Sequence, residues 1–228
     1  MELYQHTELT VHDALLLLRG LGWTLLVFGV SYLVGAVLGT AGALARHARV
    51  PGLGPLVTAY VELCRNSPLL VQLFLVYYGL PVFAGVRLSP LTAALLTLSV
   101  NTGAFLTVIV RAGLDSVPAG QWQAAQASGL RYGQIMRHVV LPQAVRFMVP
   151  PALSLAVGQL QVTSLVALIN VVDLTKVGWI LNTRTLRPFA VWPVVALLYF
   201  ALSKPLAMIA GRAEQRLRPR GAWTHEAQ

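Results

Sequence analysis

Five long apolar stretches, separated by short polar ones, dominate the chain. They cover approximately residues 21–45, 56–80, 91–110, 145–169 and 188–209. Each is close to the roughly 20 apolar residues that a helix needs to cross the hydrocarbon core of a bilayer. None alternates as a barrel strand does, and lipid cannot satisfy exposed backbone N–H and C=O groups. The pattern therefore predicts an all-α integral membrane protein with five transmembrane helices.

The same pattern divides the chain into three parts. Residues 1–20 are predicted to form an extracytoplasmic segment that is amphipathic around residues 10–18. Residues 21–217 form the transmembrane domain. Residues 218–228 contain Pro219, Gly221 and scattered polar side chains, so we expect a flexible cytoplasmic tail.

Composition agrees with a membrane protein. Hydrophobic residues make up 56% of the chain and charged residues only 11%, and the mean hydropathy is +0.67. The net charge of +9 does not indicate nucleic-acid binding, because the basic residues lie in short runs beside apolar stretches, where they anchor a membrane protein. Cys64 is the single cysteine, so we expect no internal disulfide and no metal site.

The distribution of basic residues predicts the orientation. Runs of arginine follow the first stretch, lie between the third and fourth, and follow the fifth, and such residues favour the cytoplasmic side. We therefore expect an extracytoplasmic N-terminus and a cytoplasmic C-terminus. Lys176, Arg184 and Arg187 are an exception, because they would face outward. There, Arg184 and Arg187 could contact an acidic protein rim or lipid headgroups. The cytoplasmic set is Arg46, Arg49, Arg111, Arg131, Arg137, Arg212, Arg216, Arg218 and Arg220.

Two apolar stretches carry features of local structure. Gly35 and Gly39 form a small-xxx-small pair, which we expect to pack closely within this chain rather than against a second copy. In the second stretch, Pro68 predicts a kink or a fresh helix start, since proline cannot donate a backbone hydrogen bond and clashes with the preceding turn.

Polar side chains within the apolar stretches are candidates for a translocation pathway. Each one alone is explained as well by helix–helix hydrogen bonding, and Glu62 and Arg65 are spaced for a local ion pair. Together they favour the wet lining of a route between helices, because polar groups at membrane depth usually face protein or water. The candidates are Glu62, Arg65, Asn66, Asn101, Gln159, Gln161, Thr163 and Ser164.

The polar segment between the third and fourth stretches predicts two short helices. Ser116 and Pro118 are typical of a helix start, and Gly129 is typical of a left-handed residue that ends a helix. A second helix over residues 132–140 would lead through Leu141 and Pro142 into the fourth stretch. The first helix has one face of small side chains that allows close approach by another surface, namely Gly120, Ala124, Ala127 and Ser128.

This segment resembles the signature loop of binding-protein-dependent ABC importer permeases. The family consensus reads Glu-Ala-Ala, three residues, Gly, nine residues, Ile, one residue, Leu-Pro. Residues 60–81, 116–121 and 163–165 are similar to further motifs of the polar amino-acid branch, which includes histidine, glutamate, glutamine and arginine permeases. The signature positions here are Gln123, Ala124, Ala125, Gly129, Val139, Leu141 and Pro142.

The resemblance implies a permease subunit that forms half of a pathway and carries no catalytic residue. It implies three partners besides membrane lipid: a dimer of cytoplasmic ABC ATPases docked on residues 120–129, a second identical or homologous permease, and an extracytoplasmic solute-binding protein. ATP and Mg²⁺ would be cofactors of the ATPase, because this sequence contains no phosphate-binding Gly-x-x-x-x-Gly-Lys-Ser/Thr loop. The expected location is the bacterial inner membrane.

Three ionisable positions of the family are neutral here, at Val108, Gln161 and Val162, and the signature Glu is Gln123. We therefore expect weaker charge pairing at the docking loop, and we interpret the losses as a sign that a non-identical second permease supplies the substrate site. A route without an unpaired carboxylate favours neutral polar or acidic amino acids over cationic ones. The alternative function is a self-contained ion-coupled carrier, although such carriers usually show internal repeats and none is evident here.

Overall fold

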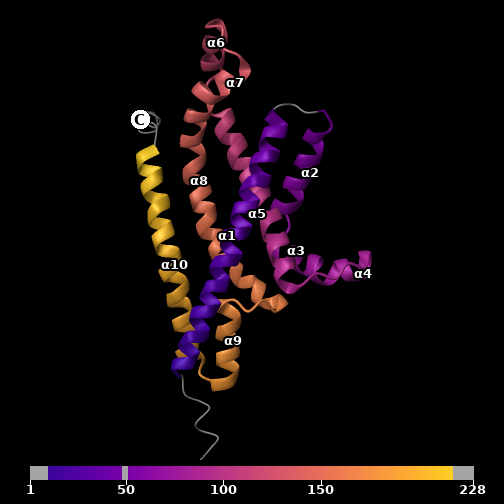
Figure 1. Ribbon diagram of the computed structural model, residues 1–228, viewed down its shortest axis with the longest axis vertical. Helices are drawn as coiled ribbons and strands as arrows, with labels where there is room; N and C mark the ends of the chain where they lie inside the picture. The colour runs from indigo at the N-terminus through magenta and orange to yellow at the C-terminus, as the bar shows by residue number, and fades with distance from the viewer. Residues whose placement is uncertain (1–9, 48–50, 218–228) are drawn as a thin grey trace, which may run out of the picture.

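The computed structural model describes residues 10–47 and 51–217, and within these ranges it is helical and contains no strand. Four helices are long: α1 (Val11–His47), α5 (Pro90–Asp115), α8 (Leu141–Val162) and α10 (Pro188–Leu217). They run side by side along the long axis of the molecule (Figure 1). The shorter elements are α2 (Leu53–Arg65), α3 (Leu69–Phe74), η2 (Leu75–Gly79), α4 (Leu80–Ala84), α6 (Ala119–Ala127), α7 (Tyr132–Ile135), η3 (Met136–Val140), η4 (Thr163–Ile169) and α9 (Leu174–Thr185).

Four helical stretches are long and apolar enough to cross a membrane: Val11–His47, Pro90–Asp115, Tyr132–Ile169 and Pro188–Leu217. The predicted count of five is reached only when Leu53–Arg65 and Leu69–Ala84 count as one span, although these two are bent by 106° at Pro68. The predicted break at this proline is confirmed, since Pro68 is extended and α3 begins directly after it. The expected second span therefore consists of two helical segments joined at a sharp bend, and α3 and α4 project sideways from the other helices (Figure 1).

The close contact between α1 and α5 depends on glycine. A Cβ atom built on Gly35 would lie 2.7 Å from the Cβ of Thr102, and one on Gly39 would lie 2.6 Å from the Cβ of Leu106. Both distances are below the contact of real side chains, so only glycine permits this approach. The small-residue pair therefore packs within the chain, as predicted.

The polar segment between the fourth and fifth apolar stretches contains the helix α9, which the hydropathy pattern did not predict. Asp173 caps α9 by accepting a hydrogen bond from the backbone N–H of Lys176 at 2.8 Å, which satisfies one of the free donors at a helix start. The hydroxyl of Tyr199 on α10 also donates to this carboxylate. Burial raises the pKa of the Asp173 carboxyl to about 6. The sequence signal for this helix was Asp173, a residue type that often caps helices, followed by a segment of mixed apolar and polar residues.

The C-terminal turn of α9 is held to α1. Arg184 donates to the Oδ2 atom of Asp13 at 2.5 Å, and the Asp13 side chain is only 2% exposed. Asp13 belongs to the segment that we expected to be a separate outer element, but in the structure it lies in the first turns of α1, which continue without a break into the first span. Residues 1–9 of that segment and the tail from 218 onward lie outside the described residues.

We expect Arg184→Met to destabilise the permease by about 1–3 kcal/mol, because Asp13 would remain buried without a charge partner. A second change, Asp13→Leu, should recover much of that loss, since the buried carboxylate is then absent. Thermal unfolding of the purified protein in detergent measures both variants. Destabilisations that simply add in the double variant would show that the two side chains are not coupled.

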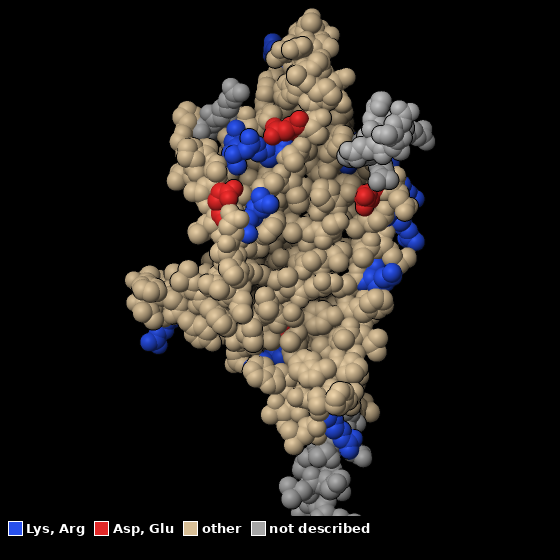
Figure 2. Space-filling model, turned by 180° about the vertical axis from the view of Figure 1, so that it is seen from behind, with Lys and Arg blue, Asp and Glu red and all other residues tan. Residues whose placement is uncertain are grey.

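We predicted that one set of basic residues shares the cytoplasmic side. Those members of the set that the structure describes lie at one end of the molecule. The C-terminal end of α1, the elements α6 and α7, and the end of α10 gather there, opposite α9 and the start of α1 (Figure 1). The space-filling view shows charged side chains clustered toward this end and a largely uncharged band beneath it (Figure 2). Arg49, Arg218 and Arg220 lie outside the described residues.

Candidate functional site

The first part of the site is α6 and the turn that ends it. Pro118 is extended and precedes the helix, as predicted. At the other end, Gly129 has a φ of 78°, which confirms the predicted left-handed conformation. The N–H of Leu130 bonds to the carbonyl of Ala125 and the N–H of Gly129 to that of Gln126, at 3.2 and 2.9 Å. This pair of bonds is the Schellman motif, which satisfies the last carbonyls of the helix.

The helix α6 is attached by one side only. Ala125 is buried among Leu114, Ile135 and Met136, and Trp122 packs against the same cluster. Ala125 therefore serves packing within the chain, although the signature pattern placed it among the docking residues. The other predicted docking residues of this helix and its end are exposed: Gly120, Gln123, Ala124, Ala127, Ser128 and Gly129.

Trp122 is a residue that sequence reasoning missed. Its ring lies 5.8 Å from that of His47, at the end of α1, and 6.0 Å from that of Tyr132, at the start of α7. These distances are within the range of favourable aromatic contacts. The only sequence signal was a large aromatic side chain within a helix of small residues. Trp122 therefore joins α6 both to the first long helix and to the following one.

The helix that follows α6 runs without interruption into the membrane. The elements α7, η3 and α8 are contiguous from Tyr132 to Val162, which agrees with the predicted second helix and its link through Leu141 and Pro142. Pro142 cannot donate to a carbonyl, and just before it the N–H of Leu141 reaches the carbonyl of Met136, five residues back. The side-chain amide of Gln143 donates to the carbonyl of Val139 at 2.9 Å. The turn that ends α6 is thus connected to α8 by a continuous helix that begins at Tyr132.

The second part of the site is a cavity of about 460 Å³ where α2, α3, α5 and α8 meet. It brings together Arg65, Asn101 and Gln159, three of the eight predicted pathway residues, from three different helices. Gly158 leaves room at the wall, because a Cβ atom there would meet nothing within 4 Å. The complete lining is Cys64, Arg65, Ser67, Pro68, Leu69, Leu70, Asn101, Phe105, Leu155, Gly158, Gln159, Val162 and Leu165.

A hydrogen-bond network fixes the break between α2 and α3 beside this cavity. The amide of Asn101 on α5 donates to the Oε1 atom of Gln72 at 3.1 Å and to the carbonyl of Cys64 at 3.3 Å. Gln72 in turn donates to the same carbonyl and to Ser67, at 2.8 and 2.9 Å. Gln72 was not among the predicted site residues, and its signal was a lone amide within an apolar run. The network satisfies backbone groups that the break would leave unpaired.

The remaining cavity polar groups are also held in place. Arg65 lies over the ring of Phe105, 5.6 Å from its centroid, so its cation is presented at the cavity wall. Gln159 donates to the hydroxyl of Ser31 on α1 at 3.3 Å. The main polar side-chain groups of this mostly apolar cavity are therefore a guanidinium group, two amides and the Ser67 hydroxyl.

The other predicted pathway residues do not line the cavity. Glu62 accepts a hydrogen bond from Asn66 at 2.6 Å, and no ion pair between Glu62 and Arg65 occurs among the described residues. Thr163 is buried and donates to the carbonyl of Leu160. Gln161 is exposed and Ser164 is half-buried.

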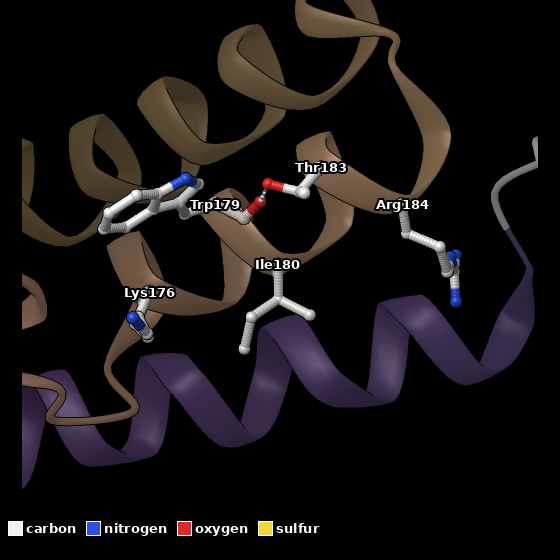
Figure 3. A pocket seen from close by; sticks show the side chains of 5 residues that line it. All are labelled: Lys176, Trp179, Ile180, Thr183 and Arg184. Carbon is white, nitrogen blue, oxygen red and sulfur yellow. Dashed lines mark hydrogen bonds between the residues drawn. The ribbon is translucent and has the colours of Figure 1, made fainter.

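A second hollow, of about 500 Å³, lies on α9 at the opposite end from α6. Its side chains are Lys176, Trp179, Ile180, Thr183 and Arg184, and Ile180 and Arg184 point toward α1 (Figure 3). Lys176 lies over the Trp179 ring at 4.6 Å, and Arg184 is paired with Asp13. None of the predicted pathway residues is part of this hollow.

Comparison with known proteins gives a consistent result. Residues 31–219 match the family described as binding-protein-dependent transport system inner membrane component. The chain is 33% identical over 211 residues to the probable amino-acid ABC transporter permease protein YckA of Bacillus subtilis, covering 92% of this chain and 93% of that protein. It is 38% identical over 194 residues to the probable glutamine ABC transporter permease protein GlnM of the same organism, covering 85% and 89%.

Comparison with solved structures gives the same family of proteins. A crystal structure of an amino acid ABC transporter with histidines superposes with a TM-score of 0.84 at 30% identity, covering 90% of this chain and 96% of that one. An inward-facing MetNI methionine ABC transporter superposes with a TM-score of 0.75 at 22% identity, which supports the fold alone.

The long apolar helices, the cavity between them and the exposed helix joined to α8 define a multi-span membrane permease. The chain belongs to the binding-protein-dependent transport system inner membrane component family, and the resemblance seen in the sequence is confirmed. It is a permease subunit of an ABC importer in the inner membrane. Its relatives are transport permeases rather than enzymes, and the ATPase of this family is a separate subunit.

Proposed function

We propose that this chain forms half of the translocation pathway for a polar amino acid and is driven by a cytoplasmic ATPase that docks on α6. The observation that carries the proposal is the connection between the two parts of the site. The helix α6 is followed by the turn at Gly129 and then by the contiguous elements α7, η3 and α8, and Gln159 of α8 lines the cavity. Movement of a docked ATPase would therefore reorient a wall of the cavity.

The proposed partners follow from the family. They are an ATPase dimer on α6, a second permease, an extracytoplasmic solute-binding protein and membrane lipid. ATP and Mg²⁺ act in the ATPase and not in this chain. The proposed orientation places the end that carries α6 in the cytoplasm, and its support is the gathering of basic residues from α1, α7 and α10 at that end.

The neutral positions at Val108, Gln161 and Val162 favoured a substrate site on a second permease, but the cavity of this chain itself offers groups that suit a ligand with a carboxylate. Arg65 offers a guanidinium group, and Asn101 and Gln159 offer amides, while the lining contains no acidic side chain. A cationic side chain of arginine or lysine would meet Arg65 without a compensating negative charge. We therefore propose neutral polar or acidic amino acids as substrates, of which glutamine, named for one relative, is the first to test.

Reconstitution tests this function directly. Vesicles that contain the permease and its ATPase, with ATP inside and the solute-binding protein outside, should accumulate labelled glutamine or glutamate. Omission of the nucleotide, the ATPase or the binding protein should abolish uptake. Tight preference for arginine in a competition assay would contradict the proposed substrate class. Uptake by this chain alone under an ion gradient would instead support the ion-coupled carrier.

A further inference from the structure

Three tryptophans lie at the level of the hollow on α9. Trp23 on α1, Trp179 on α9 and Trp192 on α10 are 43%, 48% and 39% exposed. Packing brings them to similar heights, because a Cβ atom on Gly20 would touch the first turn of α9, and one on Gly178 would touch the ring of Trp192. Exposed tryptophans gathered in a band are typical of the membrane–water interface. The hollow therefore lies at the level of the lipid headgroups.

The charge exposed at this end of the molecule is positive. Of the acidic residues that the structure describes, Asp13 and Asp173 belong to this end, and they are only 1% and 0% exposed. Arg184 and Arg187 are exposed, and Lys176 is half-buried. Basic residues are unusual on the side of a membrane protein opposite its main basic cluster, which here lies around α6. An anion from outside the chain would compensate them.

Lys176 is the cation of the hollow that lacks an acidic partner. Within the described ranges, the ion pair at this end joins Arg184 to Asp13, and Asp173 accepts from the backbone N–H of Lys176 rather than from its ammonium group. The ammonium group lies 4.6 Å from the centroid of the Trp179 ring, which attracts the charge but offers no oxygen acceptor. Its N–H donors therefore suit phosphate oxygens, with which they form strong, charge-assisted hydrogen bonds.

The rest of the hollow is partly apolar. Trp179 and Ile180 are each about half-exposed, and Ile180 points toward α1 (Figure 3). The hydroxyl of Thr183 donates to the carbonyl of Trp179 at 3.0 Å, so its oxygen can still accept a hydrogen bond from a hydroxyl of a ligand. A free inorganic anion would leave the apolar side chains exposed to water. An amphipathic anion covers them and the ammonium group together.

The acidic rim of a soluble protein fits this position less well than a lipid does. A water-soluble partner approaches from above the headgroups, whereas the tryptophans place the hollow among them. We propose that the hollow on α9 binds the headgroup of an anionic phospholipid, with the lipid phosphate at the ammonium group of Lys176. Such a site is separate from the proposed translocation pathway and does not depend on where the ATPase docks.

Photolabelling by a lipid tests the proposal. The intact transporter is reconstituted in phosphatidylcholine vesicles that contain a small fraction of phosphatidylglycerol with a photoactivatable group on its headgroup. Illumination should label residues 174–185, and unlabelled phosphatidylglycerol should compete for this segment. Lys176→Gln should raise the phosphatidylglycerol concentration for half-maximal labelling about tenfold, as expected for loss of one charge-assisted hydrogen bond. Lys176→Arg, which keeps the charge, should restore most of the labelling.

Arg187→Gln is the matched control, since it removes one positive charge at the same end but outside the hollow. It should leave the labelling of α9 unchanged. Equal effects of Lys176→Gln and Arg187→Gln, or equal labelling by a phosphatidylcholine with the same photoactivatable group, would overturn the proposal. Competition by inorganic phosphate would assign the hollow to a soluble anion. Loss of labelling on addition of the solute-binding protein would assign it to that protein, and either result also overturns the lipid site.

Discussion

Gly129→Asp is expected to reduce ATP-driven uptake to background while the permease still folds. Nothing in this chain lies within 4 Å of a Cβ atom added at Gly129, so the new side chain has room in the isolated subunit. It would, however, project a charge from the surface on which we propose that the ATPase docks. Loss of close packing at the centre of an interface typically costs about 2–4 kcal/mol, which weakens docking roughly 30-fold or more.

Gly52→Asp is the matched control for this variant. Gly52 has the same φ of 78°, it also has nothing within 4 Å of an added Cβ atom, and it lies between α1 and α2 at the same end of the molecule. The backbone strain of about 1 kcal/mol is therefore shared by both variants. Uptake in reconstituted vesicles and co-purification of the ATPase are measured together. Normal ATP-coupled uptake by Gly129→Asp, or equal losses in both variants, would contradict docking at this turn.

Gly39→Leu is expected to prevent accumulation of folded permease. The first side-chain atom would already lie 2.6 Å from the Cβ of Leu106 and 2.8 Å from the carbonyl oxygen of Gly103, which is backbone and cannot rotate away. The remaining atoms of leucine need α1 and α5 to separate along their main contact. We expect a destabilisation of at least about 3 kcal/mol. The yield of monodisperse protein in size-exclusion chromatography measures it.

The control for this variant lies on the same helix. A Cβ atom on Gly29 meets nothing within 4 Å, so Gly29→Leu adds an apolar side chain to a surface that we expect to face lipid. Its yield should match that of the unaltered chain. Equal yields for the two variants would show that α1 and α5 can separate without loss of the fold.

The short helices around the proposed docking surface could be predicted because their signals are local. Pro118 before a helix start and Gly129 after a helix end reflect backbone preferences that hold in almost any fold. The side that each residue faces was harder to predict. Ala125 belongs to the signature pattern, yet it is buried, because Leu114 and Ile135 approach this side of α6.

The candidate pathway residues were harder to predict than the short helices. Polarity at membrane depth selected Arg65, Asn101 and Gln159, which line the cavity, and five others that do not. It also missed Gln72, whose amide holds the break at Pro68 to Asn101. Which polar side chains share a cavity depends on contacts between helices that are far apart in the sequence, and hydropathy carries no information on those contacts.

The sequence by itself determined that this chain is helical and lies in a membrane, that a break follows Arg65, and that a small-residue helix precedes the fourth span. These features depend on hydropathy, on proline and glycine, and on spacing, which act within a few turns of the chain. Only the tertiary structure decided that the segment after the break leaves sideways as an arm, that residues 174–185 form a helix held by Asp13, and that three polar residues share one cavity. Each of these depends on how helices distant in the sequence approach one another, and that approach is set by close packing at residues such as Gly35 and Gly39.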